Sequence, residues 1–307
     1  MLEQVDCAAT VPVVHGTKRD SYQSRVEQVY NDSPELWKKA IGEELWFQFG
    51  VYGNQKGRLS TLDEAGRSHL ERQLELAQRL SGDYPEIQRV LEIGFGWGTG
   101  LMHLARLFPH CPRLDGINIS RTQTEYALQR IAEASLSERV HLYLGNALNI
   151  DQLPRPEEPY DLVLMRGVVT HFSPATTEAV FAALPKRMRP GAVLIISENL
   201  YNVPLQDYTP AIPDETDRLA CGYRKTPEYL TGVLADSGFT IRDVRKLPSN
   251  QEAVCWLTEI KANIEHCFGS RAPRPLQELR DHADNWSAAL RRDRVSVYSV
   301  IARSGAV

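Results

Sequence analysis

The residues best suited to chemistry form a glycine-rich turn after a short apolar run. Residues 90–93 (V-L-E-I) lead into residues 94–100 (G-F-G-W-G-T-G), and a helical pattern begins near Leu101. Glycines at alternate positions let the backbone turn tightly and approach a ligand, while the start of the helix offers unpaired amide donors. The turn does not fit the dinucleotide pattern G-x-G-x-x-G, which disfavours a nicotinamide or flavin enzyme.

Two titratable residues follow later apolar runs. His171 lies six residues after Met165, which ends one run, and Glu198 follows the run that ends at residues 195–197. If both runs are parallel strands, the two side chains reach the same edge of a sheet as the glycine turn. The structural alternative is that His171 caps the next helix and that Glu198 pairs with an arginine such as Arg166.

Short apolar runs alternate with helical segments from residue 88 onward. The runs cover residues 89–93, 114–118, 140–144, 161–165 and 192–196, and helical patterns cover residues 62–80, 122–134 and 174–188. Buried strands that alternate with helices are typical of a parallel sheet in a doubly wound α/β fold. We therefore expect a Rossmann-like sheet, which two later strands, 239–244 and 294–301, extend to seven strands.

The regions on either side of the core predict a lid and a cap. Apolar residues at intervals of three and four indicate a helix over residues 21–30, and roughly fifty residues separate the last two strands. A spacer of that length is too long for a loop, so we expect a helical cap over the carboxyl edge of the sheet. The chain thus divides into an N-terminal helical arm and lid (1–65), a Rossmann-like core (66–200), and cap insertions with the last strands (201–307).

Composition excludes several classes of protein. The chain has 307 residues, a formal net charge of -4 and 42% apolar residues, which is typical of a globular protein and disfavours nucleic acid as the partner. No run approaches the ~20 apolar residues of a membrane span, and no signal peptide is visible. The cysteines form no C-x-x-C unit, so we expect reduced thiols in a cytoplasmic protein; they are Cys7, Cys111, Cys221, Cys255 and Cys267.

Four segments resemble motifs of class I S-adenosylmethionine-dependent methyltransferases. The glycine turn resembles the motif that cradles the amino-acid part of the cofactor. Residues 116–123 (G-I-N-I-S-R-T-Q) resemble the signature of the branch that contains cyclopropane fatty acid synthases, sugar O-methyltransferases and prenyl C-methyltransferases. Residues 145–147 (G-N-A) resemble the segment beside the adenine, and residues 160–163 with 168–172 resemble the segment around the fourth strand. The resemblance covers residues 45–245 and implies S-adenosylmethionine as the cofactor.

The resemblance also implies which residues bind the cofactor. Asn118 stands where many members have an acid that binds both ribose hydroxyls, and Asn146 replaces the acid beside the adenine amine. An amide can accept such a hydrogen bond, so the cofactor still fits, with lower affinity expected. The full expected set is Tyr22, Tyr30, Glu92, Gly94, Gly96, Gly98, Thr99, Asn118, Ile119, Gln123, Asn146, Ala147 and Arg166.

In the resembling sugar O-methyltransferases, a histidine and an acid at the two strand ends act as base and partner. This implies that His171 is the general base and that Glu198 orients it or contacts the acceptor. Arg166, directly after the fourth strand, suits a phosphate or carboxylate contact or a salt bridge at the sheet edge. The other histidines show no metal-ligand spacing, so we expect no metal site.

The acceptor is expected to be a hydrophobic small molecule. Aromatic residues gather in the segments predicted to be lid, glycine turn and cap, where rings stack on an isoprenoid chain and stabilise a cation. The branch resemblance, which includes teleocidin-type C-methyltransferases, favours C-methylation of a prenyl or terpenoid chain in natural product biosynthesis, on an acceptor such as an indole alkaloid, followed by cyclisation of the cation.

Other functions remain open from the sequence. The first alternative is O- or N-methylation of a phenol, sugar or amine, which needs the same base. A more distant one is a non-catalytic protein that keeps the cofactor as a structural ligand. The turn at residues 31–34 separates the N-terminal helix from the rest, so a homo-oligomer that exchanges this helix between subunits is also expected.

Overall fold

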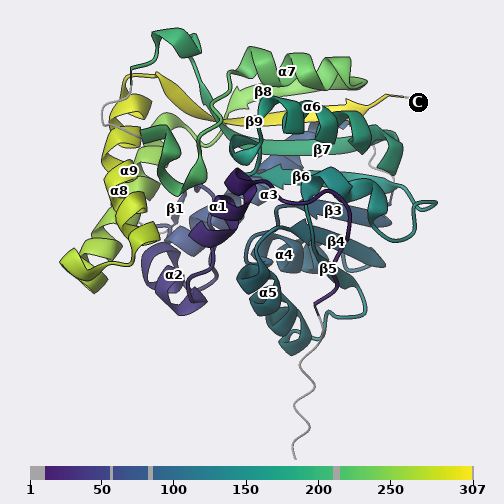
Figure 1. Ribbon diagram of the computed structural model, residues 1–307, viewed down its shortest axis with the longest axis horizontal. Coiled ribbons are helices and arrows are strands. Elements are labelled where there is room, and N and C mark those ends of the chain that lie inside the picture. Colours follow the sequence, from purple (N-terminus) through teal and green to yellow (C-terminus); the bar gives the residue numbers. More distant parts are fainter. Residues whose placement is uncertain (1–10, 56–57, 82–85, 210–214, 306–307) are drawn as a thin grey trace, which may run out of the picture.

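One sheet of seven strands forms the centre of the molecule (Figure 1). The computed structural model describes residues 11–55, 58–81, 86–209 and 215–305. The strand order is β5-β4-β3-β6-β7-β9-β8. The strands are β3 (Arg89–Ile93), β4 (Arg113–Asn118), β5 (Val140–Leu144), β6 (Tyr160–Arg166), β7 (Met188–Tyr201), β8 (Phe239–Lys246) and β9 (Val295–Ser304), and a separate hairpin joins β1 (Asn54–Gln55) to β2 (Arg58–Leu59).

The sheet is mixed rather than wholly parallel. Strands β3 to β7 pair in parallel, whereas β9 runs antiparallel between β7 and β8. The expected fold class, a doubly wound Rossmann-like sheet of seven strands, is confirmed. One detail is wrong: Glu198 lies inside β7 rather than at its end, because β9 pairs with β7 as far as Tyr201 and so prolongs the strand.

Helices cover both faces of the sheet. Helices α3 (Leu62–Ser81), α4 (Thr99–Leu107) and α5 (Arg121–Glu133) pack on one face, and α6 (Pro174–Ala183) and α7 (Pro227–Asp236) pack on the other. The helix expected over 174–188 is shorter, since the chain tightens into a 3₁₀ turn, η3 (Leu184–Arg187), with Pro185 at its start. No helix within the described ranges is long and apolar enough to cross a membrane.

A lid and a cap stand at the carboxyl edge of the sheet, on the left of Figure 1. The cap consists of α8 (Asn250–Phe268) and α9 (Arg274–Arg291), and it shares a hydrophobic core with α1 (Ser21–Val29) and α2 (Pro34–Ile41). The expected helical lid and cap are therefore present. Helix α2 was not anticipated, although Ser33 caps it and Pro34 opens it, which is a recognised helix start.

Candidate active site

A pocket of about 140 Å³ lies at the carboxyl edge, between the glycine turn and helix α1. Gln23, Val26 and Gln48 line it, although no sequence motif marks them. The residues expected from the sequence that line it are Tyr30, Glu92, Gly94, Gly96, Thr99, Asn118, Ile119, Gln123, Asn146, Ala147 and Arg166, together with His171. Segments from six parts of the chain thus meet at one cavity, where the sequence motifs place the cofactor.

The glycine turn approaches the pocket with its bare backbone. Gly94 and Gly96 have φ of +71° and +54°, a region that favours glycine. A Cβ atom on Gly94 would lie 2.4 Å from Val168, whereas one on Gly96 would meet nothing within 4 Å. Gly94 is therefore required for packing beneath the turn, and Gly96 leaves open space on the pocket side. Such a cradle fits the amino-acid part of S-adenosylmethionine.

Glu92 and Arg166 are buried in the pocket wall with unused hydrogen-bonding capacity. Glu92 Oε2 and Arg166 Nε and Nη2 have no hydrogen-bond partner among the described residues. Burial raises the pKa of Glu92 to about 7, against the opposing pull of the Arg166 charge, and burial lowers the pKa of Arg166 to about 10. A carboxyl and a guanidinium that face one cavity match the ammonium and carboxylate of an amino acid.

Two pairs of amides line the part of the pocket where the sequence places ribose and adenine. Asn118 Nδ2 donates to Gln123 Oε1 over 2.9 Å, and Asn146 Nδ2 donates to Gln23 Oε1 over 2.8 Å. The oxygens of Asn118 and Asn146 accept backbone amides of residues 119 and 148. Each asparagine is thereby held in one orientation by its own loop and a neighbouring glutamine.

His171 reaches the pocket from the 3₁₀ turn η2 (Val169–His171). Its Nδ1 lies 2.8 Å from the carbonyl oxygen of Ala220, which only accepts, so Nδ1 carries the proton and Nε2 a lone pair. Nε2 is 3.5 Å from the hydroxyl of Tyr30. Burial lowers the pKa of His171 to about 4, and the charge of Lys225 adds to the effect. The imidazole is therefore neutral near pH 7 and can accept a proton at Nε2.

Glu198 lies behind the turn that carries His171 and does not line the pocket. Its Oε2 accepts the backbone amide of Thr170 over 3.0 Å, and its Oε1 accepts that of Asn199 over 2.9 Å. The suggested pairing of Glu198 with Arg166 does not form: the charge of Lys225 acts on Glu198, whereas the charge of Arg166 acts on Glu92. Glu198 thus acts on the backbone next to His171 rather than on its ring.

Tyr22 and Gly98, which the resemblance places at the cofactor, are not among the lining residues. The Tyr22 hydroxyl donates to the carbonyl of Ala220 and accepts the amide of Gly222, both over 2.6 Å, because α1 packs against η5 (Glu215–Ala220). A Cβ atom on Gly98 would lie 2.8 Å from Ala127, so Gly98 lets the turn pack against α5. Tyr22 attaches the lid of this chain to its own cap.

A series of aromatic contacts runs from His171 into the cap. The ring of Tyr30 lies 5.9 Å from that of His171 and 6.0 Å from that of Phe47. Phe47 in turn lies 5.1 Å from Trp37 and 6.1 Å from Trp256 of α8. The stretch 45–53 is thus both core and pocket wall, since Phe49 is buried against Trp256 while Phe47 faces the cavity.

Comparisons with known proteins agree with this geometry. Residues 90–191 match the family described as Methyltransferase domain. Methyltransferase GfsG of Streptomyces halstedii is 26% identical over 197 residues, which cover 64% of this chain and 66% of that protein. The chain thus spans just under two thirds of the length of this curated relative.

Several solved structures share the fold over nearly their whole length. The [4+2]-cyclase SpnF superposes with a TM-score of 0.72 at 18% identity, covering 97% of this chain and 99% of SpnF. Mycolic acid cyclopropane synthase CmaA1, complexed with SAH and CTAB, gives 0.77 at 16% identity, covering 94% and 99%. Geranyl diphosphate C-methyltransferase from Streptomyces coelicolor A3(2), in complex with Mg²⁺, geranyl-S-thiolodiphosphate and S-adenosyl-L-homocysteine, gives 0.67 at 12% identity, covering 94% and 99%.

These findings identify the core of the chain. Residues 90–191 match a methyltransferase domain, and the chain shares the fold of solved structures that hold SAH. Among the described residues, Cys111, Cys221, Cys255 and Cys267 are free thiols, and Cys7 lies outside them. No group of three or more His, Cys, Asp or Glu side chains in the described ranges is arranged to hold a metal ion.

Proposed function

We propose that this protein transfers the methyl group of S-adenosylmethionine to a carbon atom of an uncharged prenyl chain on a hydrophobic small molecule. The observation that carries the proposal is the position of His171. Its unprotonated Nε2 faces the pocket, and Tyr30 and Phe47 continue from it as a wall of aromatic rings. A base beside aromatic rings suits a reaction that passes through a carbocation.

Cofactor binding is assigned from the groups left open in the pocket. Arg166 binds the carboxylate of the methionine part, Glu92 binds its ammonium, and the backbone at Gly96 lies against it. Asn118 and Asn146 contact the ribose and the adenine from the strand ends where the motifs place them. Tyr30 covers the cofactor from the end of α1, since it lines the same pocket.

The cofactor supplies an electrophilic methyl group on a sulfonium. The π electrons of the acceptor alkene form the new C–C bond, the C–S bond breaks, and its electron pair remains on sulfur. The acceptor is then a carbocation, which the faces of Tyr30 and Phe47 stabilise. His171 Nε2 finally accepts a proton from a carbon next to the cation, directly or after ring closure, which restores a neutral product.

The charges in the pocket support a neutral acceptor rather than a diphosphate. Arg166 is the only lysine or arginine among the lining residues, and the proposal assigns it to the cofactor carboxylate. A diphosphate at neutral pH needs several cations or a metal held by carboxylates, and the described residues offer no such cluster. A prenyl group on an uncharged ring system, as in an indole alkaloid, fits better.

The test combines methyl-labelled S-adenosylmethionine with prenylated indoles, geranyl diphosphate, phenols, sugars and amines, and reads the label position by mass spectrometry and NMR. Label on a prenyl carbon of a neutral acceptor is expected. Label on geranyl diphosphate overturns the neutral acceptor, and label on oxygen or nitrogen overturns alkene chemistry. Cyclisation of an acceptor without label overturns methyl transfer altogether.

The variant His171→Asn tests the base. Asparagine retains an amide donor near the carbonyl of Ala220 but offers no basic nitrogen at the position of Nε2. We expect kcat to fall by about 10²–10⁴-fold, the usual contribution of a general base, with cofactor affinity changed by less than about threefold. Unchanged kcat would remove His171 from the mechanism.

A further inference from the structure

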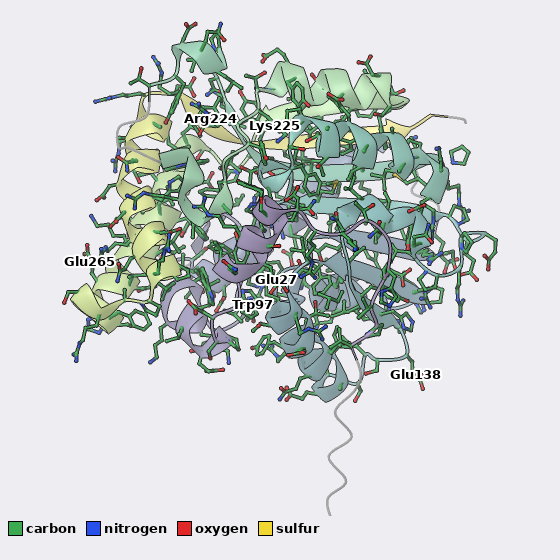
Figure 2. All side chains as sticks on the ribbon, viewed as in Figure 1. Glu27, Trp97, Glu138, Arg224, Lys225 and Glu265 are labelled. Atoms are coloured by element: carbon green, nitrogen blue, oxygen red, sulfur yellow. The ribbon has the colours of Figure 1, made fainter. Side chains whose placement is uncertain are left out.

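A short segment of the cap region, residues 219–225, holds the turn that carries His171. It leads from η5 toward α7, and Lys225 lies within it where the cap meets the sheet (Figure 2). The Lys225 side chain is 3% exposed, although lysine is rarely buried. We call residues 219–225 the strap.

The ammonium group of Lys225 bonds to both ends of turn η2. Nζ donates to the carbonyl of Val169 over 2.8 Å and to that of Phe172 over 2.7 Å, and a third bond of 3.0 Å reaches Tyr223 in the strap. Val169 and Phe172 bracket His171 in the sequence. The two bonds of Lys225, to carbonyls on either side of His171, therefore fix the position of the His171 backbone.

These bonds define the charge state of Lys225. Three carbonyl acceptors require three N–H donors, which only the ammonium form supplies. Glu198 accepts one backbone amide on each oxygen, as a carboxylate does, and one of these amides belongs to Thr170 in the same turn. Turn η2 is thus held through its carbonyls by a cation and through its amide by an anion.

The strap also holds the imidazole itself. The carbonyl of Ala220 accepts the Nδ1 proton of His171 and, on the same oxygen, the hydroxyl proton of Tyr22. Leu219 and Ala220 both have φ of +53°, which residues with a Cβ adopt rarely. Glu278 of α9 accepts the amide of Leu219 over 3.0 Å and stabilises this conformation. The strap therefore presents the carbonyl of Ala220, which selects the tautomer of His171.

We propose that Lys225 is a positioning residue for the reaction, which sets the orientation and tautomer of His171 by fixing turn η2 to the strap. The claim that this matters for turnover rests on the proposed role of His171 as base. The claim that Lys225 fixes the imidazole does not rest on that role, because it concerns the protein without an acceptor. The two claims therefore fail separately.

The groups around the imidazole come from three other elements. Tyr30 follows α1, Lys225 and Cys221 belong to the strap, and Glu198 belongs to β7. The charge of Lys225 lowers the pKa of His171, while burial and neighbouring Glu198 raise the pKa values of Tyr30 and Cys221, so both stay neutral. Removal of the lysine charge thus raises the pKa of His171, and a looser turn raises it further by admitting water.

The experiment is ¹⁵N NMR of histidine-labelled full-length protein with S-adenosylhomocysteine, which reports the tautomer and pKa of His171 without an acceptor. In the unmodified protein we expect the Nδ1–H tautomer and a pKa of about 4. In Lys225→Met we expect a mixture of tautomers and a pKa higher by at least about one unit. Lys261→Met is the matched control, since Lys261 pairs with Asp284 on the exposed face of the cap.

Turnover supplies the second readout. With an accepted substrate, we expect Lys225→Met to lower kcat about 10–100-fold with KM for the cofactor changed less than about threefold, and Lys225→Arg to restore part of kcat. If Lys225→Met does not fold, Glu198→Leu combined with Lys225→Met removes both charges together and is measured instead. An unchanged tautomer and pKa in the folded variant would overturn the proposal. A normal tautomer with kcat and cofactor affinity falling in parallel would also overturn it, since that indicates a merely structural role.

Discussion

Two buried pairs of arginine and carboxylate stand at opposite ends of the same sheet, and they differ in how fully they are bonded. Arg89 and Asp115 lie near the amino end of strands β3 and β4, and Arg166 and Glu92 lie at the carboxyl end of β6 and β3. All four side chains are largely removed from water, so each should cost free energy unless something compensates. The compensation has a different source at each end.

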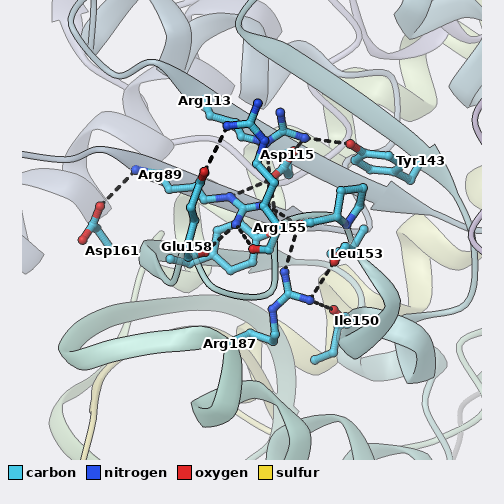
Figure 3. A network of polar contacts seen from close by, with 12 residues as sticks. Arg89, Arg113, Asp115, Tyr143, Ile150, Leu153, Arg155, Glu158, Asp161 and Arg187 are labelled. Carbon is cyan, nitrogen blue, oxygen red and sulfur yellow. Dashed lines mark hydrogen bonds and ion pairs between the residues drawn. The ribbon is translucent and has the colours of Figure 1, made fainter.

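At the amino end the protein itself satisfies the charges (Figure 3). Arg89 Nε and Nη2 donate to Asp115 over 2.9 and 2.7 Å, and its remaining donors reach the carbonyls of Pro154, Arg155 and Glu158. Every nitrogen of this guanidinium has a partner. Such a network joins loops and strands, and Asp115 Oδ1, which has no hydrogen-bond partner among the described residues, lies 3.0 Å from Arg113 Nη2 in an ion pair.

At the carboxyl end the charges remain open. Arg166 Nε and Nη2 and Glu92 Oε2 have no hydrogen-bond partner in the described part of the chain, and both residues face the pocket. Buried polar groups without partners are rare in folded proteins, so their presence in a cavity indicates a ligand that completes them. The comparison teaches that the same residue types can be bonded within the chain at one end of a sheet and left open, for the proposed cofactor, at the other.

The largest effect is expected for Arg89→Met. The change leaves Asp115 with a weaker set of partners and deprives the carbonyls of residues 155 and 158 of their donor, whereas the carbonyl of Pro154 keeps a bond from Arg187 Nη2. Loss of one partner from a buried pair costs about 3–5 kcal/mol, which urea unfolding should detect as a lower free energy of unfolding. Cofactor affinity of the folded protein, measured by calorimetry, should stay within about twofold, and a larger change would contradict the division between the two ends.

Arg166→Met should show the reverse pattern. Because the guanidinium leaves donors unbonded in the ligand-free protein, its removal should change the free energy of unfolding by less than about 1 kcal/mol, or even raise it. Cofactor affinity should fall about 10–100-fold through loss of a charge-assisted contact to the carboxylate. Strong destabilisation with unchanged affinity would show that Arg166 is structural, like Arg89.

The pH dependence of Glu92 sharpens the comparison. Its pKa in the folded, ligand-free protein is about 7, above the ordinary value of 4.5, so the protonated form is favoured by folding. The stability due to this group is complete below pH 4.5 and is lost as the pH rises toward 7. An ammonium ligand requires the carboxylate, so cofactor affinity should change in the opposite direction, falling up to about tenfold per unit as the pH drops below 7.

Glu92→Gln provides the test of this opposition. In this variant, the unfolding free energy of the ligand-free protein and the cofactor affinity should both depend less on pH between 5.5 and 7.5, because glutamine does not titrate. Urea unfolding measures the first quantity and calorimetry the second. A cofactor affinity that is independent of pH in the unmodified protein would refute the assignment of the ammonium to Glu92.

The sequence predicts individual strands and helices better than the contacts between segments that lie far apart in the chain. The strands β3 to β6 match their apolar runs within one residue. Strands β3 and β6 are buried almost throughout and are nearly continuous apolar runs, whereas β5 alternates between buried and half-buried residues. The extension of β7 to Tyr201 has no such signal, since pairing with β9 produces it from a distant part of the chain. Helix α2 carried its signal at Ser33 and Pro34, but it spans only 8 residues.

Prediction of the site is limited in the same way, because contacts between distant segments leave no local sequence signal. The glycine turn and the strand ends could be located because motif spacing places their residues at one edge. The bonds of Tyr22 to the strap and of Glu198 to the turn could not, since their partners lie far away in the sequence and depend on how the cap packs. Lys225 gave no signal either, because a single lysine is ordinarily a surface residue.

The smallest effect is expected for Tyr143→Phe, which removes a hydroxyl that contacts the arginine network. The hydroxyl of Tyr143 accepts a hydrogen bond of 2.8 Å from Arg113 Nη2, which also pairs with Asp115 over 3.0 Å. Arg113 therefore keeps its principal partner in the variant, and the side chain of Tyr143 is only half buried, so water replaces part of what is lost.

The expected cost is about 0.5–1.5 kcal/mol of unfolding free energy, well below that of Arg89→Met. Cofactor affinity and the tautomer of His171 should not change, because the Tyr143 hydroxyl bonds to Arg113 at the start of β4 and Tyr143 is not among the lining residues. If this variant weakened cofactor binding, the two ends of the sheet would be energetically coupled. The fully bonded arginine network would then belong to the site as well as to the scaffold.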